Sequence, residues 1–206
     1  MNEKGNYIIV EGGSGSGKTI QIDKLIKGSL NDYWLIREPG GTQFGEKIRS
    51  ALLDLGQDFI DPNAEFLAFS AARANLIRGV VIPGLLVGKN YIADRSWFSS
   101  YAYQGARGIP KETILKISEF ATDNLKPDLV IFYKIEAETG QRRKRGMADV
   151  DRIDLETLEF LNEVIKNYNE LSVLFPTFWE TIDTSGSIEE VYQETLGVLR
   201  RRKLIE

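Results

Sequence analysis

The stretch that decides the fold is YIIVEGGSGSGKT, residues 7–19. A short apolar run leads into glycines and the stretch closes on a lysine and a threonine, which predicts a buried strand, a tight loop and the start of a helix. Glycine accepts positive φ and lets backbone N–H groups turn inward, so a loop of this kind can surround a phosphate. The predicted phosphate-binding residues are Gly12, Gly13, Ser14, Gly15, Ser16, Gly17, Lys18 and Thr19.

Different groups of this loop are expected to bind different parts of a nucleotide and its metal ion. The inward N–H groups and the helix N-terminus bind phosphate oxygens, Lys18 reaches the β and γ oxygens, and the Thr19 hydroxyl binds Mg²⁺. Apolar residues at helical spacing follow the loop, at Ile22, Leu25 and Ile26. This context favours a nucleotide site over a glycine-rich turn that binds nothing.

Composition excludes several classes of protein. The 206 residues are 42% hydrophobic and 27% charged, which predicts one substantial core and a single domain over residues 1–206. Cysteine and histidine are both absent, which is compatible with the cytoplasm and excludes disulfides, Ser-His-Asp triads and His-bound zinc. A net charge of −4 argues against a nucleic-acid-binding module, and no uninterrupted apolar run approaches about 18 residues, which argues against a membrane protein.

Apolar runs alternate with segments of helical spacing along the whole chain. After the first strand, further strands are expected at residues 33–37, 91–93, 128–135 and 178–182. Helices are expected at residues 18–29, 44–55, 63–86, 96–103, 111–125, 136–145, 158–168 and 188–199. Pro83 is expected to kink or break the long helix. The alternation predicts an α/β fold like that of P-loop NTPases: a doubly wound sheet of about five parallel strands flanked by helices.

Taken in order, the motifs of this chain resemble one family, the thymidylate kinases of the nucleoside monophosphate kinase superfamily. The motifs are GGSGSGKT, REPGGT, EKIRSALLD, AEFLAFSAAR, DR followed by SSYAYQG and ARG, PDLVIFY, an arginine-rich segment and DRID. Many NTPases share the phosphate loop alone, whereas this ordered set covers nearly the whole chain. The resemblance implies Mg²⁺-dependent transfer of the γ-phosphoryl group of ATP to dTMP, giving dTDP and ADP for dTTP synthesis. It also implies a homodimer, with the helix at residues 66–86 as the expected contact.

Charged residues follow two of the predicted strands, at the edge where parallel sheets bind ligands. Glu38 stands in REPGGT, and Asp94 is followed by Arg95 after the third strand. A structural turn and a structural ion pair would also explain them, but phosphoryl transfer needs metal ligands and fixed positive charge. The resemblance implies that Glu38 and Arg49 act at the acceptor phosphate. It also implies that Asp94 binds Mg²⁺ through water and that Arg95 bridges the two phosphate chains.

A second group of residues is expected to bind the acceptor base and sugar. Phe69 and Arg73 are four residues apart and therefore share a helix face. An aromatic residue at this spacing is usually core, but the resemblance makes Phe69 a platform for a pyrimidine and Arg73 a partner of the base. It also assigns Ser100 and Gln104 to the thymine edge, and places the Tyr103 ring where a ribose 2′-hydroxyl would lie.

The remaining basic cluster lies at about residues 140–154. A solvated helix face would explain it. The alternative is a small lid that closes over ATP and brings arginines to the transition state. The phosphate loop contains no arginine, and the resemblance implies that the lid then supplies it, with Arg143 and Arg145 as the first candidates and Arg152 next.

Two positions depart from the pattern of the family. Ser14 stands where a carboxylate usually contacts the acceptor sugar, and Ser96 and Trp97 follow the DR motif in place of a tyrosine. Both departures concern the acceptor and leave two alternatives open. One is a kinase for another deoxypyrimidine monophosphate or a deoxynucleoside, and the other is a nucleotide-binding regulator without catalysis.

Overall fold

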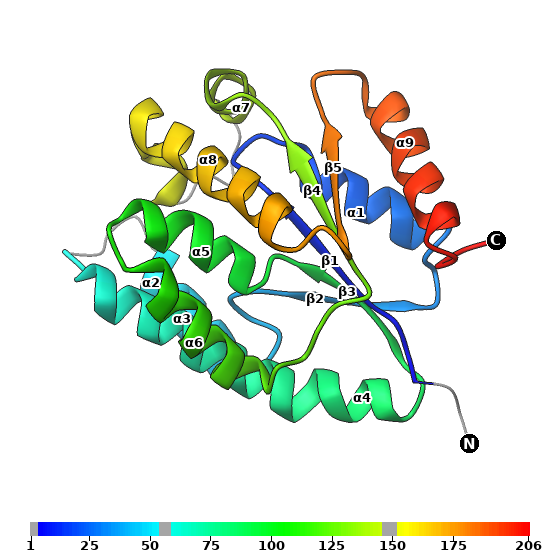
Figure 1. The fold of residues 1–206 in the computed structure, drawn as a ribbon, viewed down its shortest axis with the longest axis horizontal. Coiled ribbons are helices and arrows are strands. Elements are labelled where there is room, and N and C mark those ends of the chain that lie inside the picture. Colours follow the sequence, from blue (N-terminus) through cyan, green and yellow to red (C-terminus); the bar gives the residue numbers. More distant parts are fainter. Residues whose placement is uncertain (1–3, 54–58, 146–151) are drawn as a thin grey trace.

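The protein is described by a computed structural model that covers residues 4–53, 59–145 and 152–206. These residues form one parallel sheet in the order β2-β3-β1-β4-β5, so the phosphate-loop strand is central (Figure 1). The strands are β1 (Tyr7–Gly12), β2 (Tyr33–Arg37), β3 (Asn90–Asp94), β4 (Leu129–Lys134) and β5 (Trp179–Asp183). The prediction of an α/β sheet of about five parallel strands is confirmed.

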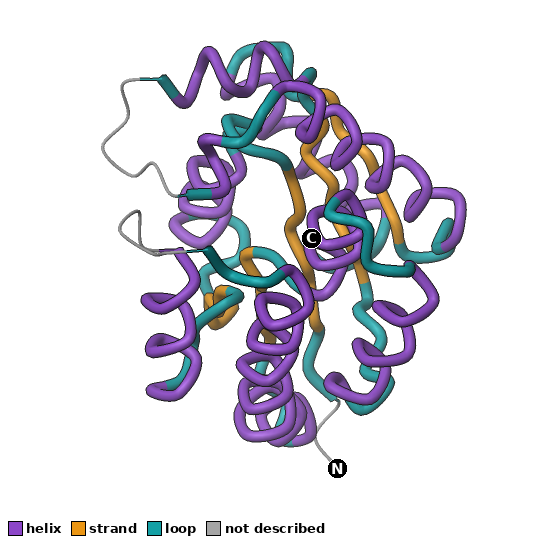
Figure 2. The backbone as a smooth tube through the Cα atoms, turned by 90° about the vertical axis from the view of Figure 1, so that its left-hand side faces the viewer, coloured by secondary structure: helices purple, strands orange, loops and turns teal. Residues whose placement is uncertain are grey.

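Helices cover both faces of the sheet because its central strands, β1 and β4, are apolar on both sides. In β1, Ile9 packs into the cluster under α3, α5 and α8, whereas Ile8 and Val10 pack into the cluster under α1 and α9. Figure 2 shows the strands enclosed between these helices. The helices are α1 (Lys18–Lys27), α2 (Gln43–Leu53), α3 (Pro62–Leu76), α4 (Ile82–Leu86), α5 (Trp97–Ala106), α6 (Lys111–Thr122), α7 (Ala137–Lys144), α8 (Leu158–Leu174) and α9 (Ile188–Arg201), with a π-helical turn η1 (Ile77–Val81) and a 3₁₀ turn η2 (Ile153–Leu155).

The long helix predicted for residues 63–86 is present but changes its hydrogen bonding before Pro83. The Ile82 N–H donates to the Ile77 carbonyl in the π-helical turn η1, and α4 begins directly after it. Wider turns of this kind accommodate a proline, which lacks an N–H and crowds the preceding turn. The helix therefore continues through Pro83 to Leu86.

By length and composition, this helix, residues 62–86, would be able to cross a membrane. The sequence predicts no membrane-spanning segment here, because charged residues interrupt the apolar runs of this helix. Two of these charged residues, Glu65 and Arg73, are buried and form ion pairs inside the protein. In the most apolar 18-residue stretch of the helix, 44% is buried. These features fit a core helix.

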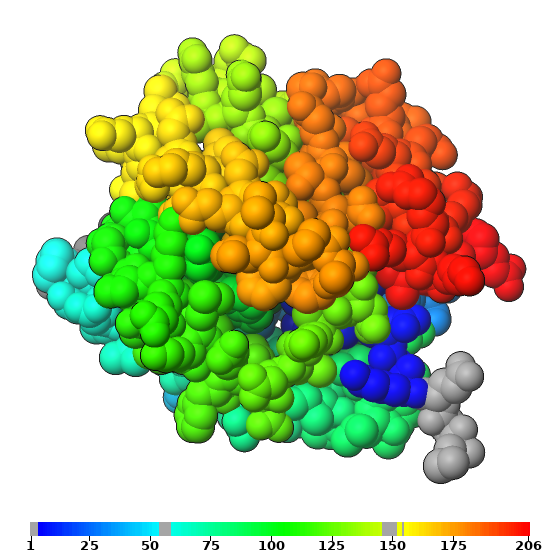
Figure 3. Space-filling model, viewed as in Figure 1, coloured from blue at the N-terminus to red at the C-terminus, as the bar shows by residue number. Residues whose placement is uncertain are grey.

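The carboxyl ends of the strands gather the loops that carry the predicted site. Gly12, Arg37 and Asp94 end three neighbouring strands, and the register pairs Val10 and Arg37 with Asp94. Across the face shown in Figure 3, α8 (yellow to orange) packs against α5 (green) and closes that side of the sheet. The segment predicted to form a lid, about residues 140–154, includes the end of α7 and the first two residues of η2, while residues 146–151 lie outside the described residues.

Candidate active site

The loop after β1 forms a cradle that is lined mainly by backbone atoms. Gly15 and Gly17 have φ of 71° and 79°, which a residue with a Cβ rarely adopts. Gly17 is the N-cap of α1, and no side chain caps the first turn, so its N–H groups are available for an anion. A Cβ at Gly12 would lie 3.0 Å from the Tyr133 carbonyl oxygen, which explains why this position needs glycine.

Lys18 and Asp94 meet at the floor of the cradle. The Lys18 ammonium forms an ion pair with the Asp94 carboxylate at the end of β3. Burial lowers the pKa of Lys18, and the nearby Arg95 guanidinium lowers it further, against the opposite effect of Asp94. Burial alone would raise the pKa of Asp94, but Lys18 and Arg95 outweigh it and lower that pKa. Asp94 is thus held as an anion, and it lines the same cavity as Thr19, which is exposed.

A large cavity of about 2000 Å³, including space open to solvent, begins at the cradle and runs along α1 toward α9. It contains every predicted cradle residue from Gly13 to Thr19, together with Arg143 and Lys144 of α7. Its far end is formed by the loop between β5 and α9, at Thr184, Gly186 and Ser187. A cavity that extends from the cradle to this loop suits a nucleotide with its phosphates in the cradle.

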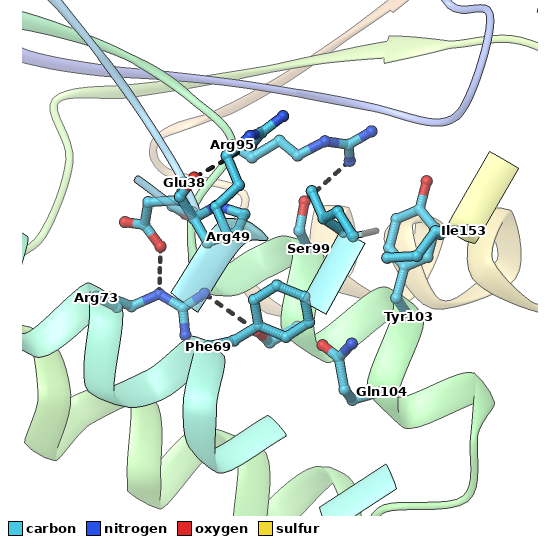
Figure 4. A pocket seen from close by; sticks show the side chains of 13 residues that line it. Glu38, Arg49, Phe69, Arg73, Arg95, Ser99, Tyr103, Gln104 and Ile153 are labelled. Carbon is cyan, nitrogen blue, oxygen red and sulfur yellow. Dashed lines mark hydrogen bonds and ion pairs between the residues drawn. The ribbon is translucent and has the colours of Figure 1, made fainter. Parts of the chain in front are cut away.

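A second, smaller cavity of about 650 Å³, again including space open to solvent, lies beyond Glu38 and Arg95 (Figure 4). Its walls come from β2, α2, α3, α5 and η2 and their flanking residues. Every predicted acceptor residue lines it. The lining residues are Glu38, Pro39, Arg49, Leu53, Phe69, Arg73, Arg95, Ser96, Ser99, Ser100, Tyr103, Gln104 and Ile153.

Glu38 and Arg73 form a buried ion pair in the wall of the small cavity. The Arg73 Nε donates to Glu38 Oε2 at 2.6 Å, and its Nη2 donates to the Ser100 hydroxyl at 3.0 Å. Burial raises the pKa of Glu38, while Arg73 opposes that rise. Glu38 Oε1 and Arg73 Nη1 are buried without a hydrogen-bond partner. Each side chain therefore offers one unsatisfied polar atom to a ligand.

Three charged side chains, Glu38, Arg49 and Arg95, line both cavities. The Arg49 Nη1 donates to the Pro39 carbonyl at 3.1 Å, which holds this guanidinium beside Glu38. Arg95 has φ of 71°, and its guanidinium lies 5.4 Å from the centre of the Tyr103 ring. Fixed positive charge and a carboxylate thus stand where a ligand in one cavity would meet a ligand in the other.

Arg95 is held by a buried carboxylate that the motif analysis did not single out. Glu11, at the end of β1, is fully buried, accepts from the Ser99 and Tyr168 hydroxyls at 2.6 and 2.9 Å, and accepts from the Ser96 N–H at 2.8 Å. Ser99 in turn accepts from Arg95 Nη1 at 3.1 Å. A charged residue inside a predicted buried strand was the signal that could have found it.

The arginines of the predicted lid lie in different places. The Arg143 Nη1 donates to the Thr184 carbonyl at 2.9 Å, so this side chain lines the large cavity. Arg145 is exposed at the end of α7 and is not part of the described lining of either cavity. Arg152 pairs instead with Glu65 of α3, behind the small cavity.

The described residues contain no cluster of three or more Asp, Glu, His or Cys side chains that could enclose a metal ion. The oxygen donors near the cradle are the Thr19 hydroxyl, the Asp94 carboxylate and the unpartnered Oε1 of Glu38. Mg²⁺ prefers oxygen ligands and keeps several waters when it is bound together with substrate phosphates. This donor set therefore fits Mg²⁺ better than a metal that needs a complete protein cage.

Comparisons with known proteins agree with this geometry. The family model described as thymidylate kinase matches residues 10–195. The chain is 37% identical over 203 residues to a thymidylate kinase from Clostridium novyi, covering 96% of this chain and 99% of the relative. It is also 37% identical over 204 residues to one from Ligilactobacillus salivarius, covering 95% and 98%.

A solved structure gives the same result for the fold. The crystal structure of thymidylate kinase from Ehrlichia chaffeensis superposes with a TM-score of 0.76 at 26% identity, covering 95% of this chain and 99% of the other. The family match spans most of the chain, including the cradle from Gly12 and both cavities. The chain therefore belongs to the thymidylate kinase family.

Proposed function

We propose that this protein transfers the γ-phosphoryl group of ATP to dTMP and releases dTDP and ADP. The observation that carries the proposal is that Glu38, Arg49 and Arg95 line both cavities. One nucleotide can occupy the cradle and a second the small cavity, with their phosphates meeting at these side chains. A phosphate oxygen of dTMP then forms the new P–O bond while the bond from Pγ to the β-phosphate oxygen breaks.

The residues of the chain act by positioning and by charge. The cradle amides and Lys18 hold the donor phosphates, while Arg49 and Arg95 offset the charge of the acceptor phosphate. Among the arginines of the predicted lid, Arg143 is the best candidate to reach the transferring phosphoryl group, because it lines the large cavity. Arg145 is exposed, and Arg152 pairs with Glu65. The acceptor phosphate is anionic near neutral pH, so no strong general base is needed.

Mg²⁺ is the cofactor that the oxygen donors fit. Thr19 and Asp94 would hold it, Asp94 through water, and Glu38 would accept from one of its waters. Bound there, it would neutralise charge on the transferring phosphoryl group. The absence of a closed carboxylate cage among the described residues agrees with an ion held mainly by phosphates and water.

The small cavity supports a pyrimidine deoxynucleotide as acceptor. Phe69 offers a ring to stack on, and Arg73 Nη1 offers a donor without a partner. The buried Tyr103 ring adds bulk to the wall. A second candidate, another deoxypyrimidine monophosphate, is favoured by one observation: Ser14 replaces a carboxylate that relatives are expected to use for the acceptor sugar.

Assembly and location are part of the same proposal. We place the enzyme in the cytoplasm, and we expect a homodimer. Exposed apolar side chains lie on α2, α3 and α6, at Phe44, Leu67 and Phe120, which are 47%, 55% and 78% exposed. This extends the expected contact beyond the long helix, and light scattering would measure the mass directly.

The test is a panel of acceptors in an assay of ADP release from ATP. We expect the highest kcat/KM with dTMP, lower values with dUMP and dCMP, none with thymidine, and loss of turnover in EDTA. In Lys18→Met, kcat should fall by about 10²–10³-fold or more while circular dichroism is unchanged. Preference for another acceptor would support the second candidate, and tight ATP binding without turnover on any acceptor would contradict a kinase.

A further inference from the structure

A buried carboxylate of α3 lies directly behind the small cavity without lining it. Glu65 is 1% exposed, in the first turn of the helix. Its Oε1 accepts from the Gln104 Nε2 at 2.9 Å and lies 3.3 Å from the Arg107 Nε, and its Oε2 pairs with Arg152. Two side chains from α5 and its C-cap, and one from the residue before η2, therefore converge on one carboxylate.

These contacts fix the orientation of the Gln104 amide. A carboxylate that faces two guanidinium groups can only accept hydrogen bonds, so the NH₂ side of the amide must face Glu65. The amide oxygen of Gln104 is then directed to the small cavity, where Figure 4 shows the side chain near Phe69 and Tyr103. Within residues 4–53, 59–145 and 152–206, nothing donates a hydrogen bond to that oxygen.

The cavity thereby offers one acceptor and one donor to the edge of a base. Gln104 presents its amide oxygen, and Arg73 presents the unpartnered Nη1. A pyrimidine with a 4-oxo group and an N3–H carries the complementary pattern, acceptor then donor. Cytosine carries the reverse, a 4-amino donor beside a bare N3, and would leave both protein groups unsatisfied.

We propose that Glu65 is a positioning residue for base selection, which sets the Gln104 amide so that 4-oxo pyrimidines are accepted and cytosine is rejected. The proposal rests on the proposed function, because it assumes that the base of the acceptor nucleotide occupies the small cavity. Glu65 touches no substrate itself and acts through Gln104.

Glu65 is also held in place by two arginines, each with a further partner. The Arg107 Nη2 donates to Glu156 at 2.6 Å, and the Arg152 Nε donates to the Leu52 carbonyl at 3.3 Å. Both arginines therefore have a second anchor, and the carboxylate cannot rotate away from Gln104 without leaving a guanidinium unpaired. Ile153, beside Arg152, is itself part of the cavity wall. The same network thus orders both the amide oxygen that faces the base edge and the end of the predicted lid segment.

The experiment compares dTMP, dUMP and dCMP in the wild type and in Glu65→Gln. In the variant, one amide oxygen replaces two carboxylate oxygens, and Arg152 and Arg107 compete for it. The new NH₂ group then faces Gln104 and turns its amide over, which presents a donor to the cavity. We expect the ratio of kcat/KM for dTMP to that for dCMP to fall at least tenfold, mainly through KM. Where the turnover of dCMP is below detection, the inhibition constant of dCMP against dTMP is measured in place of its kcat/KM.

A double variant separates positioning from a general loss of structure. In Gln104→Leu the amide is absent, so adding Glu65→Gln should change the ratio no further. An equal change in both backgrounds, or an unchanged ratio in Glu65→Gln, would overturn the proposal. Glu112→Gln, an exposed carboxylate paired with Lys116 on α6, is the matched control and should leave the ratio unaltered.

Two outcomes keep this test distinct from that of the proposed function. If the wild type does not phosphorylate dTMP, the proposed function fails before Glu65 is considered. If the wild type does so and Glu65→Gln fails to fold, Glu65→Asp takes its place. Aspartate keeps the charge facing the arginines but withdraws the oxygen from Gln104, so the ratio should again fall, and an unchanged ratio would refute the role of Glu65.

Discussion

The cradle and the small cavity are built in opposite ways. The cradle comes from consecutive residues, 12–19, and its chemistry lies largely in backbone N–H groups. The small cavity is lined by side chains that run from Glu38 to Ile153 in the sequence, and its wall contains the buried ion pair of Glu38 and Arg73. The first depends on close approach of the backbone, and the second depends on charge balance.

This difference predicts how each region responds to mutation. In the cradle, loss of a charge should impair phosphoryl transfer and leave the fold intact, whereas an added Cβ should displace the loop. In the small cavity, loss of one charge leaves its buried partner uncompensated, which destabilises the fold itself. The two regions can therefore be separated by measuring stability and kinetics on the same variants.

The largest expected effect on stability is that of Arg73→Met. Its partner Glu38 has a side chain only 4% exposed, and the substitution leaves this carboxylate without its guanidinium. Breaking a buried pair from one side costs about 3–5 kcal/mol, so the free energy of unfolding in urea should fall by about that amount. Glu38→Gln/Arg73→Met should recover much of the loss, because it removes the stranded charge.

The matched variant in the cradle is Lys18→Met. Burial already lowers the pKa of Lys18, and its partner Asp94 keeps a side chain 24% exposed and a neighbouring Arg95. The loss of unfolding free energy should therefore be smaller than that of Arg73→Met by about 2 kcal/mol or more. Equal losses would remove the distinction between the two regions.

An intermediate effect is expected where the cradle meets the lid. The backbones of Gly15 and Gly140 pack together, and a Cβ on Gly140 would overlap the Ser14 carbonyl. Alanine is ordinarily better than glycine inside a helix by about 0.5–1 kcal/mol, yet Gly140→Ala should displace α7 from the cradle. We expect KM for ATP to rise about tenfold, equivalent to about 1.4 kcal/mol, with KM for dTMP unchanged.

Gly79→Ala is the control for this substitution. Gly79 lies in η1, where an added Cβ would meet nothing within 4 Å and the backbone of Gly79 does not have a positive φ. Its KM values should equal those of the wild type, and its stability should be equal or slightly higher. If Gly140→Ala behaved in the same way, the contact between α7 and the cradle would not matter for ATP binding.

The same contrast explains what could be predicted from the sequence. The cradle is contiguous, so a spacing pattern predicts its strand, its loop and the role of Lys18. The alternation of apolar runs predicts the parallel sheet, because β4 is buried on both faces as its composition indicates. The acceptor residues Phe69, Arg73 and Gln104 were reached through the family resemblance, since their spacing alone is equally typical of core.

What could not be predicted is how distant charges pair. Nothing local in the sequence indicates that Arg152 pairs with Glu65 rather than reaching the phosphates, or that Ser99 joins Arg95 to Glu11. Such partners are set by the packing of α3, α5 and the segment at η2, which no periodicity encodes. The π-helical turn before Pro83 was also not predicted: the sequence indicates a kink or a break, whereas the helix continues to Leu86 through a wider turn.

The smallest predicted effect concerns Glu11, which lies between the two regions. Burial raises the pKa of its carboxyl above the ordinary 4.5, against the opposing effects of Arg95 and of the Ser99, Tyr168 and Ser96 hydrogen bonds. The folded protein therefore binds more protons at Glu11 than the unfolded chain does above pH 4.5. By linkage, the stabilisation from this proton is complete below pH 4.5 and is lost as the pH rises through the folded pKa.

Glu11→Gln should remove this dependence while keeping the shape of the side chain. Urea unfolding of the wild type and the variant at pH 5, 6 and 7 should give stabilities that diverge, with the wild type losing more stability than the variant as the pH rises. Glu38 acts in the same direction and Asp94 in the opposite one, and both are present in the two proteins. Because the Glu11 charge also raises the pKa of Glu38, Glu11→Gln weakens the contribution of Glu38 as well, which adds to the divergence. Parallel curves would mean that Arg95 and the hydroxyls fully offset burial, so that Glu11 belongs with the charge-balanced small cavity rather than standing apart from it.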